Sequence, residues 1–248
     1  MPRYFRADKI INDVAVESGL SPVDDVFASL DPSFIQMRYL LNGAGQEMLE
    51  LFPWQILRRK HIITTDSATY PDQKYPLPDD FGYMIDQTGW DASNNLPLQG
   101  PMTPQQWAYL EGRNLASSTV YATFRLDAGE VQFFPAELSD GRDISFFYIS
   151  RFWVQNQLNP NNIQEREEVL ANTDVVMYEP ILIKRMLKMK FLAAKGFDNS
   201  NATQEFIAAF DSWTGKSKGG QVLSASGGRS RVPLIDIWRN VSDSGYGV

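Results

Sequence analysis

The chain has no cysteine and a single histidine among its 248 residues. Disulfide bonds, thiolate zinc sites and cysteine nucleophiles are therefore excluded, and so is a metal site built from several histidines. A Ser-His-Asp triad would have to use His61, but the sequence contains no Gly-x-Ser-x-Gly nucleophile motif. We therefore predict no catalytic residue, no metal site and no cofactor.

Long apolar runs and phosphate-binding loops are also missing. No run approaches the ~20 apolar residues that a membrane-spanning helix needs, and the first ten residues lack the apolar core of a signal peptide. No Gly-x-x-x-x-Gly-Lys-Ser/Thr loop occurs, and Gly43-Ala44-Gly45 lies in a helical pattern instead of following a strand. These absences predict a soluble protein that is made in the cytoplasm and binds neither membrane nor nucleotide.

The charge balance limits the range of partners. There are 30 acidic and 23 basic residues, which give a net charge of −7 at pH 7. Phosphate binding needs clustered Lys and Arg, so this charge opposes general adhesion to nucleic acid and leaves only local basic patches open. Hydrophobic residues make up 43% of the chain, enough to bury the core of one or two domains.

Helical periodicity predicts two helices in the N-terminal part of the chain. They cover residues 6–18 and 32–51, and Asp31 is the expected N-cap of the second. Gly43 and Gly45 weaken the second helix by roughly 1 kcal/mol each relative to Ala. Their presence indicates a bend or a close contact with another backbone.

Two further helices are expected on the C-terminal side. The first covers residues 175–195, with Thr173 or Asp174 as its N-cap. Pro180 lies inside this pattern, so the helix either begins beside the proline or kinks there. The second helix covers residues 202–214. Its apolar face is expected to consist of Phe206, Ile207, Phe210 and Trp213.

Between these helix pairs the pattern changes to that of strands. Short runs rich in β-branched and aromatic residues alternate with Pro, Gly, Asp and Asn, which predicts an antiparallel β-domain of six or seven strands. Ala128-Gly129 and residues 139–141 are the expected hairpin connections, and Asn94-Asn95 is an expected turn. The main runs are residues 62–65, 74–77, 81–90, 120–127, 131–134 and 144–150.

Together these elements predict an α+β fold. An α-helical bundle is formed by residues 1–55 and 160–215, and residues 56–159 form an inserted antiparallel β-domain, either a sandwich or barrel-like. An extended C-terminal arm, residues 216–248, completes the chain and is rich in Gly and Ser.

The arm combines cations with apolar anchors. Two interpretations stay open, a disordered and solvated terminus or a docking arm. The anchors favour docking, because a merely solvated tail seldom contains them. The candidate docking residues are Lys216, Lys218, Arg229, Arg231, Leu234, Ile235, Trp238 and Tyr246.

A basic stripe is expected on the helix at residues 175–195. Lys184, Lys188 and Lys195 fall on one side of the helix, with Arg185 beside them. The stripe is explained either as a solvated face that also complements the helix C-terminus, or as a contact with an acidic neighbouring subunit or with DNA phosphate.

Residues 75–113 are rich in Pro, Trp and turn residues but contain no catalytic constellation. Thr103 followed by Pro104 predicts the start of a short helix. The acids of this region are expected in turns and caps and not as the carboxylate pair of a glycosidase. They are Asp79, Asp80, Asp86 and Asp91.

Three motifs stand out in this region: YPLPDDF at residues 75–81, GWD at 89–91 and PLQGPMTPQQW at 97–107. In these motifs the chain resembles the head-to-tail adaptor proteins of tailed double-stranded DNA phages, in particular the tail tubular protein A and gatekeeper-type connectors of short-tailed phages. The resemblance continues in AAKGFD at 193–198 and DSGYGV at 243–248, so it spans most of the chain as a pattern of turns and helix ends.

The resemblance implies a structural protein of the virion and not an enzyme. Such adaptors form rings of about twelve copies beneath the portal and extend the channel through which DNA leaves the capsid. The helices would build the ring, the β-domain would face the tail or nozzle protein, and the arm would dock on the portal. An acidic lumen would let DNA slide without sticking.

A second hypothesis is a β-domain tail enzyme or carbohydrate-binding module that acts on the cell envelope. Trp90 and Trp107 would be its aromatic platforms. The enzyme version needs a pair of buried carboxylates with perturbed acidity, whereas the acids here cluster in turns. The sequence therefore favours the adaptor.

Overall fold

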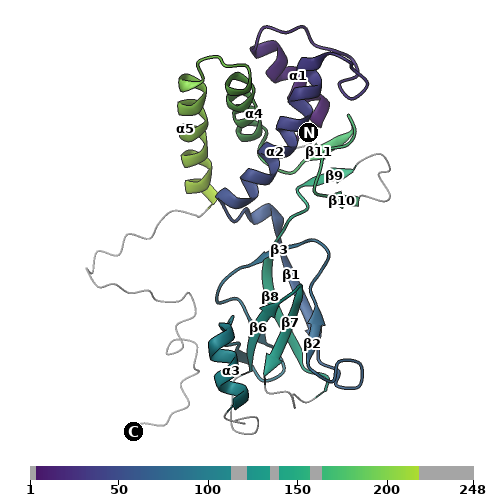
Figure 1. The fold of residues 1–248 in the computed structure, drawn as a ribbon, viewed down its shortest axis with the longest axis vertical. Helices are drawn as coiled ribbons and strands as arrows, with labels where there is room; N and C mark the ends of the chain where they lie inside the picture. Colours follow the sequence, from purple (N-terminus) through teal and green to yellow (C-terminus); the bar gives the residue numbers. More distant parts are fainter. Residues whose placement is uncertain (1–3, 113–121, 135–139, 157–163, 218–248) are drawn as a thin grey trace, which may run out of the picture. The chain divides into compact units, whose positions relative to one another are not determined.

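Along the sequence, the long helices α1 (Ala7–Glu17) and α2 (Pro32–Leu51) precede the strands, and α4 (Pro180–Ala194) and α5 (Ser200–Ser217) follow them (Figure 1). The computed structural model describes residues 4–112, 122–134, 140–156 and 164–217. The predicted α+β class is confirmed. A 3-10 turn, η1 (Gln55–Leu57), follows α2, and a short helix, α3 (Pro104–Gly112), lies among the strands.

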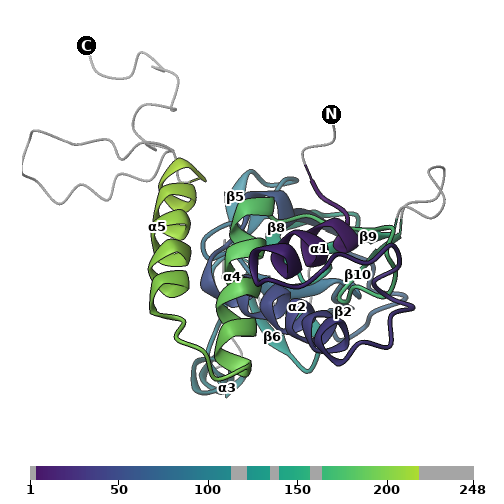
Figure 2. The same ribbon diagram turned by 90° about the horizontal axis from the view of Figure 1, so that it is seen from above.

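The long helices pack around α4, which contacts α1, α2 and α5 (Figure 2). Ala7, Ile10, Ile11 and Val14 of α1 are buried at helical spacing, and Asp31 caps α2 by accepting a 2.8 Å hydrogen bond from the Ser33 amide. The predicted N-terminal helices are therefore confirmed. In α5, however, Ile207 is exposed while Phe206 and Ala209 are buried, so the predicted apolar face was wrong at Ile207.

The start of α4 decides between the two alternatives for residues 175–195. The helix begins at Pro180 with Glu179 as its N-cap residue and has no kink at the proline. Asp174 is not a helix cap. It is fully buried at the start of a strand, where it accepts hydrogen bonds from the Leu170 and Ala171 amides at 2.7 and 2.9 Å.

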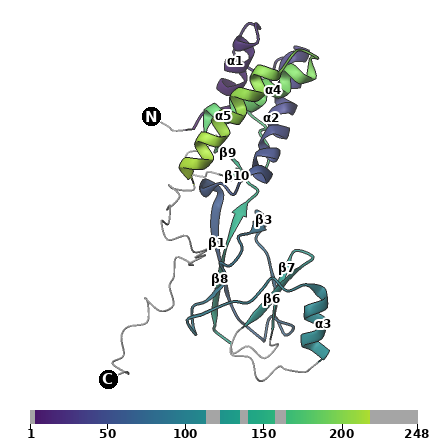
Figure 3. The ribbon, with the colours of Figure 1, turned by 90° about the vertical axis from the view of Figure 1, so that its left-hand side faces the viewer.

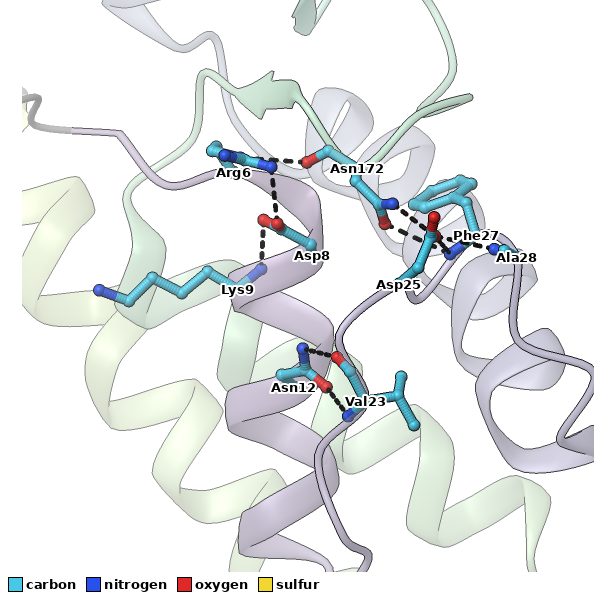
Figure 4. A network of polar contacts seen from close by, with 9 residues as sticks. All are labelled: Arg6, Asp8, Lys9, Asn12, Val23, Asp25, Phe27, Ala28 and Asn172. Carbon is cyan, nitrogen blue, oxygen red and sulfur yellow. Dashed lines mark hydrogen bonds and ion pairs between the residues drawn. The ribbon is translucent and has the colours of Figure 1, made fainter.

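The loop between α1 and α2 is fixed by side chains that bond to backbone (Figure 4). Asn12 donates to the Val23 carbonyl at 2.9 Å and accepts from the Val23 amide at 3.0 Å. Asp25 accepts from the Phe27 and Ala28 amides and from the side chain of Asn172. These hydrogen bonds hold the pKa of Asp25 below its usual value, and the one from Asn172 contributes most to the shift.

Two antiparallel sheets form the β-domain. In the larger sheet, β8 pairs with β1 on one side and with β3 and β4 on the other, and β5 pairs with β4. Figure 3 shows β1 and β8 side by side. The smaller sheet has the order β2-β7-β6. The bounds are β1 Arg58–Thr64, β2 Lys74–Pro76, β3 Phe81–Met84, β4 Trp90–Asp91, β5 Leu96–Pro97, β6 Thr123–Asp127, β7 Glu130–Phe134 and β8 Asp143–Ser150.

One face of each sheet contributes to a shared hydrophobic core. Ile63 of β1 and Phe146 of β8 pack in one cluster with Phe124 of β6 and Phe133 of β7. The sheets therefore pack face to face as a sandwich, the first of the two predicted forms. The other face of the smaller sheet is covered by Trp107 of α3, whose ring lies 5.9 Å from that of Phe134.

Two of the three predicted connections are right and one is wrong. Ala128 and Gly129 both have positive φ, 48° and 82°, and join β6 to β7 as a two-residue hairpin. Asn95, with φ 56°, likewise turns β4 into β5. Residues 139–141 do not close a hairpin, because β7 and β8 belong to different sheets.

A third sheet lies outside the predicted strands. It has the order β10-β9-β11 and consists of β9 (Val154–Asn156), β10 (Gln164–Arg166) and β11 (Asp174–Val176). The Val176 amide donates to the Phe5 carbonyl at 3.2 Å, which ties this sheet to the residues just before α1. Part of the region predicted as helical bundle is therefore strand.

Gly45 of α2 makes a close contact, as predicted, but its neighbour is a side chain and not a backbone. A Cβ built on Gly45 would lie 2.1 Å from Cζ2 of Trp153, whereas a Cβ on Gly43 would have nothing within 4 Å. Gly45 therefore makes room for the indole ring.

Candidate protein-docking site

An aromatic groove opens where α5 ends and η1 begins. It encloses about 470 Å³, which is within the usual range of ligand and side-chain pockets. Four separate parts of the chain form it: the residues before α1, the segment around η1, the segment before α4, and the last turns of α5. We call it the aromatic groove; its lining is Tyr4, Trp54, Gln55, Ile56, Met177, Tyr178, Glu179, Trp213 and Lys216.

Trp54 is the fixed centre of the aromatic groove. Its indole N–H donates a 2.6 Å hydrogen bond to the Met48 carbonyl at the end of α2. Its ring meets those of Phe52, Tyr178 and Phe210 edge-on, with centroids 5.1, 5.7 and 6.1 Å away. These edge-to-face contacts lock the side chain, so the groove exists before anything binds to it.

Tyr178 forms a second rigid part of the wall. Its hydroxyl donates a 3.0 Å hydrogen bond to the Gly45 carbonyl, and its ring stacks on Trp153 at 5.6 Å. Burial raises the pKa of Tyr178 well above its usual value, so this phenol stays neutral. The hydrogen bond to Gly45 and the stacking on Trp153 hold these three residues together.

Charged residues are found at the rim. The Lys216 ammonium lies 5.1 Å from the ring centroid of Trp213. Lys216 was predicted to belong to the arm, but α5 continues to Ser217, so this lysine is helical. The other arm residues lie outside the described part of the chain: Lys218, Arg229, Arg231, Leu234, Ile235, Trp238 and Tyr246.

The basic stripe of α4 contacts its own chain. Lys184 forms an ion pair with Asp13, and Lys188 forms one with Glu17 at 3.0 Å, so both bind acids of α1. The helix packing thus accounts for these two charges without DNA or a neighbouring subunit. A pattern on one helix cannot reveal this arrangement, because the acids lie about 170 residues away.

The other two stripe residues also have partners within the chain. Arg185 donates to the Glu205 carbonyl of α5 at 2.8 Å. Lys195 lies 5.4 Å from the ring centroid of Phe191 and 3.4 Å from the Ser33 hydroxyl. Both remain near the surface, so an additional contact with a partner stays a prediction for them.

The acids at residues 79–91 were expected in turns, and two of them have clear structural partners. Asp91 accepts hydrogen bonds from the Ser93 and Asn94 amides, both at 3.1 Å, and pairs with Arg142. Asp80 accepts a 2.8 Å hydrogen bond from the Tyr148 hydroxyl. Asp91 is thus the turn residue predicted by the sequence.

His61 is half-buried in β1, with its ring 5.4 Å from that of Phe146. Burial lowers the pKa of the imidazole below its usual value, and the nearby charge of Asp80 opposes this shift. Among the described residues, no group of three or more His, Cys, Asp or Glu side chains is arranged to hold a metal ion.

The part of the chain described by the structure also contains no helix that is both long and apolar enough to cross a membrane. The aromatic groove itself combines fixed aromatic side chains with the charged residues Glu179 and Lys216. Sequence reasoning missed Trp54, Met177 and Tyr178. The one local signal was Phe52-Pro53-Trp54 directly after a helix.

No protein-family model matches the chain, and no curated protein matches it.

Proposed function

We propose that the protein is a structural head-to-tail adaptor of a phage virion. In this role about twelve copies form a ring beneath the portal and extend the DNA exit channel toward the tail or nozzle protein. It is not an enzyme and acts at the head-tail interface after synthesis in the host cytoplasm.

The observation that carries the proposal is the order of the elements. Strands β1 to β8 lie between the helix pair α1 and α2 and the helix pair α4 and α5. The same arrangement, a helical bundle with an inserted β-domain, is what the resemblance at residues 75–107 implies. Fold alone does not establish function, so the proposal also depends on surfaces suited to protein contact.

The aromatic groove is such a surface. It lies at the end of α5, directly before residues 218–248, which contain the apolar anchors Leu234, Ile235 and Trp238. A rigid aromatic wall and an apolar segment are both typical of protein interfaces, where buried aromatic residues supply much of the binding energy. Both are consistent with an adaptor that contacts more than one partner.

Native mass spectrometry of the full chain with its portal protein tests the ring. The expected result is a complex that contains a ring of about a dozen copies of this chain on the portal. Absence of any such ring in the presence of the portal would rule the adaptor role out. A monomer without the portal would not, because the portal can template assembly.

A truncation tests the role of the arm. The cut belongs after Ser217, because removal of residues 216 and 217 would shorten α5. The truncated chain is expected to keep its melting temperature and lose attachment to the portal. Unchanged attachment would show that residues 218–248 do not dock there.

The alternative, a carbohydrate-binding module or tail enzyme, loses one of its two platforms. Trp107 is only 2% exposed, and its indole N–H donates to Glu111 at 2.6 Å. Trp90 remains 37% exposed and is the platform that this alternative retains. Binding of cell-wall glycans that disappears in Trp90→Ala would favour the alternative over the adaptor.

A further inference from the structure

The larger sheet leaves part of its outer face uncovered: Ile149 of β8 is buried there among the helices, but Ile62, Phe147 and Trp90 are exposed. Its inner face packs against the smaller sheet, whose own outer face is covered by α3. A sheet in a globular domain normally buries its apolar side chains against another layer. The uncovered face of β1, β8 and β4 therefore needs a separate explanation.

Large apolar side chains gather on this face. Ile62 of β1 is 57% exposed, and Phe147 of β8 and Trp90 of β4 are each 37% exposed. The register explains their proximity: Ile62 and Trp90 both lie opposite Ser145, on either side of β8, and Phe147 follows two residues later on the same face. They form one contiguous patch, which we call the sheet patch.

Cations border the sheet patch along β1. Arg58 places its guanidinium 5.8 Å from the ring centroid of Phe147, and Lys60 lies directly opposite Phe147 in the register. At the far end of the strand, Thr64 donates a 2.7 Å hydrogen bond to Asp143. The patch thus has an apolar centre, two cations along β1, which we call the basic border, and one acid, Asp143, at its far end.

This composition suits a protein partner better than a nucleic acid. The patch includes an aliphatic residue, Ile62, beside its central strand β8, and it has only two cations, whereas phosphate recognition gains affinity from many cations. Aromatic residues and Arg around an apolar centre are the composition of protein interfaces. The basic border selects a partner surface that is acidic and partly apolar.

We propose that the sheet patch binds a second copy of this chain. The chain carries a net charge of −7, so its surface outside the patch is acidic on balance and complements the basic border. Contact between two identical sheet patches would close as a dimer, whereas a ring of about twelve copies needs a heterologous contact. The patch must therefore meet a different, acidic surface of the next copy, and such a head-to-tail contact closes into a ring or extends as a filament.

This inference rests on the proposed ring and assigns one of its contact surfaces. The first test places a photo-crosslinking amino acid at position 147 of the full chain, at concentrations up to roughly 0.5 mM, where weak protein contacts are populated. The expected products are covalent dimers and larger ladders, with crosslinks to peptides outside the sheet patch. Absence of crosslinked multimers overturns the proposal, and crosslinks only between two copies of the patch overturn its head-to-tail form.

A matched pair of variants provides the second test. Ile62→Thr keeps a β-branched residue in the strand while it removes apolar surface from the patch, and Ile207→Thr removes the same group from an equally exposed site on α5. Sedimentation velocity is expected to show self-association at least about tenfold weaker for Ile62→Thr, and weakened less for Ile207→Thr. Equal association of the wild type and Ile62→Thr would contradict the proposal.

The outcomes separate this inference from the proposed function. A ring on the portal that forms equally well with Ile62→Thr and with Lys60→Glu refutes the sheet patch and leaves the adaptor intact. Self-association through the patch without a ring on the portal supports the contact and refutes the adaptor. Saturable binding of a single-stranded oligonucleotide that Phe147→Thr abolishes would replace the protein partner by a nucleic acid and overturn the proposal.

Discussion

Gly45 of α2 and the indole of Trp153 are in such close contact that no side chain fits between them. A Cβ on Gly45 would come within 2.1 to 2.4 Å of three ring atoms of Trp153. Trp153 in turn stacks on Tyr178, which forms part of the wall of the aromatic groove. A single glycine therefore connects the packing of α2 with the groove.

Gly45→Ala is expected to destabilise the fold by about 2 kcal/mol or more, because the indole would have to move out of a filled core. Gly43→Ala, two residues away in the same helix, is expected to stabilise it by about 0.5–1 kcal/mol, since the added methyl meets nothing within 4 Å and Ala favours the helix. Urea unfolding of both variants provides the comparison. Equal effects would show that Trp153 does not occupy this position.

Asp174 is expected to be one of the most sensitive polar residues. It is fully buried and accepts hydrogen bonds from two backbone amides and, at 2.7 Å, from Arg166. Asp174→Ala leaves these donors without an acceptor and is expected to cost about 3 kcal/mol. Asp127→Ala is the control, because this exposed acid pairs with Arg125 only at 3.8 Å and its loss should cost under about 0.5 kcal/mol. Similar unfolding midpoints for the two variants would contradict the assigned role.

The single histidine predicts a pH dependence. Because burial lowers the folded-state pKa of His61 below the unfolded value, the unfolded chain binds more protons in the interval between the two. The contribution of neutral His61 to the free energy of unfolding is therefore fully present above pH ~6.5, and it decreases as the pH falls toward the folded-state pKa. The measurement is the free energy of unfolding between about pH 5.5 and 7.5, where His61→Gln should show a flatter profile. An identical slope in wild type and variant would assign the pH dependence to other groups.

The basic stripe can be tested by a double-mutant cycle. Lys188→Glu places a like charge beside Glu17 and is expected to destabilise the fold by only a few tenths of a kcal/mol, because solvent screens the pair. The double variant with Glu17→Lys should recover that loss. A change in portal or DNA binding with no change in stability would indicate that Lys188 faces a partner instead of α1.

Local signals in the sequence were sufficient for elements whose ends are set by neighbouring residues. Asp31 before Pro32 marks α2, Thr103 before Pro104 marks α3, and Ala128-Gly129 marks the β6-β7 hairpin. The α3 start is reinforced by reciprocal bonds, since the Gln106 amide donates to the Thr103 hydroxyl at 3.3 Å and the Thr103 amide donates to the Gln106 side chain at 3.0 Å.

Features that depend on distant pairing were not predictable from one sequence. The sheet of β9, β10 and β11 was missed because its strands have only three residues each. β9 and β10 are mostly polar, and the valines of β11 were assigned to the helix predicted for residues 175–195. The aromatic groove was missed because Trp54, Tyr178 and Trp213 come from three separate segments. The ion pairs of Lys184 and Lys188 were missed for the same reason, since helical periodicity says nothing of the helix that packs alongside.

The central position of β8 has a consequence for how the chain folds during synthesis. β1, β3 and β4 leave the ribosome before β8, yet each of them pairs with it, so the larger sheet cannot form until residues 143–150 have emerged. Likewise, α1 and α2 cannot complete their packing until α4 has been synthesised, because both contact it. A chain that ends before residue 143 can already form the smaller sheet of β2, β7 and β6, but it leaves β1, β3 and β4 without the central strand with which they pair.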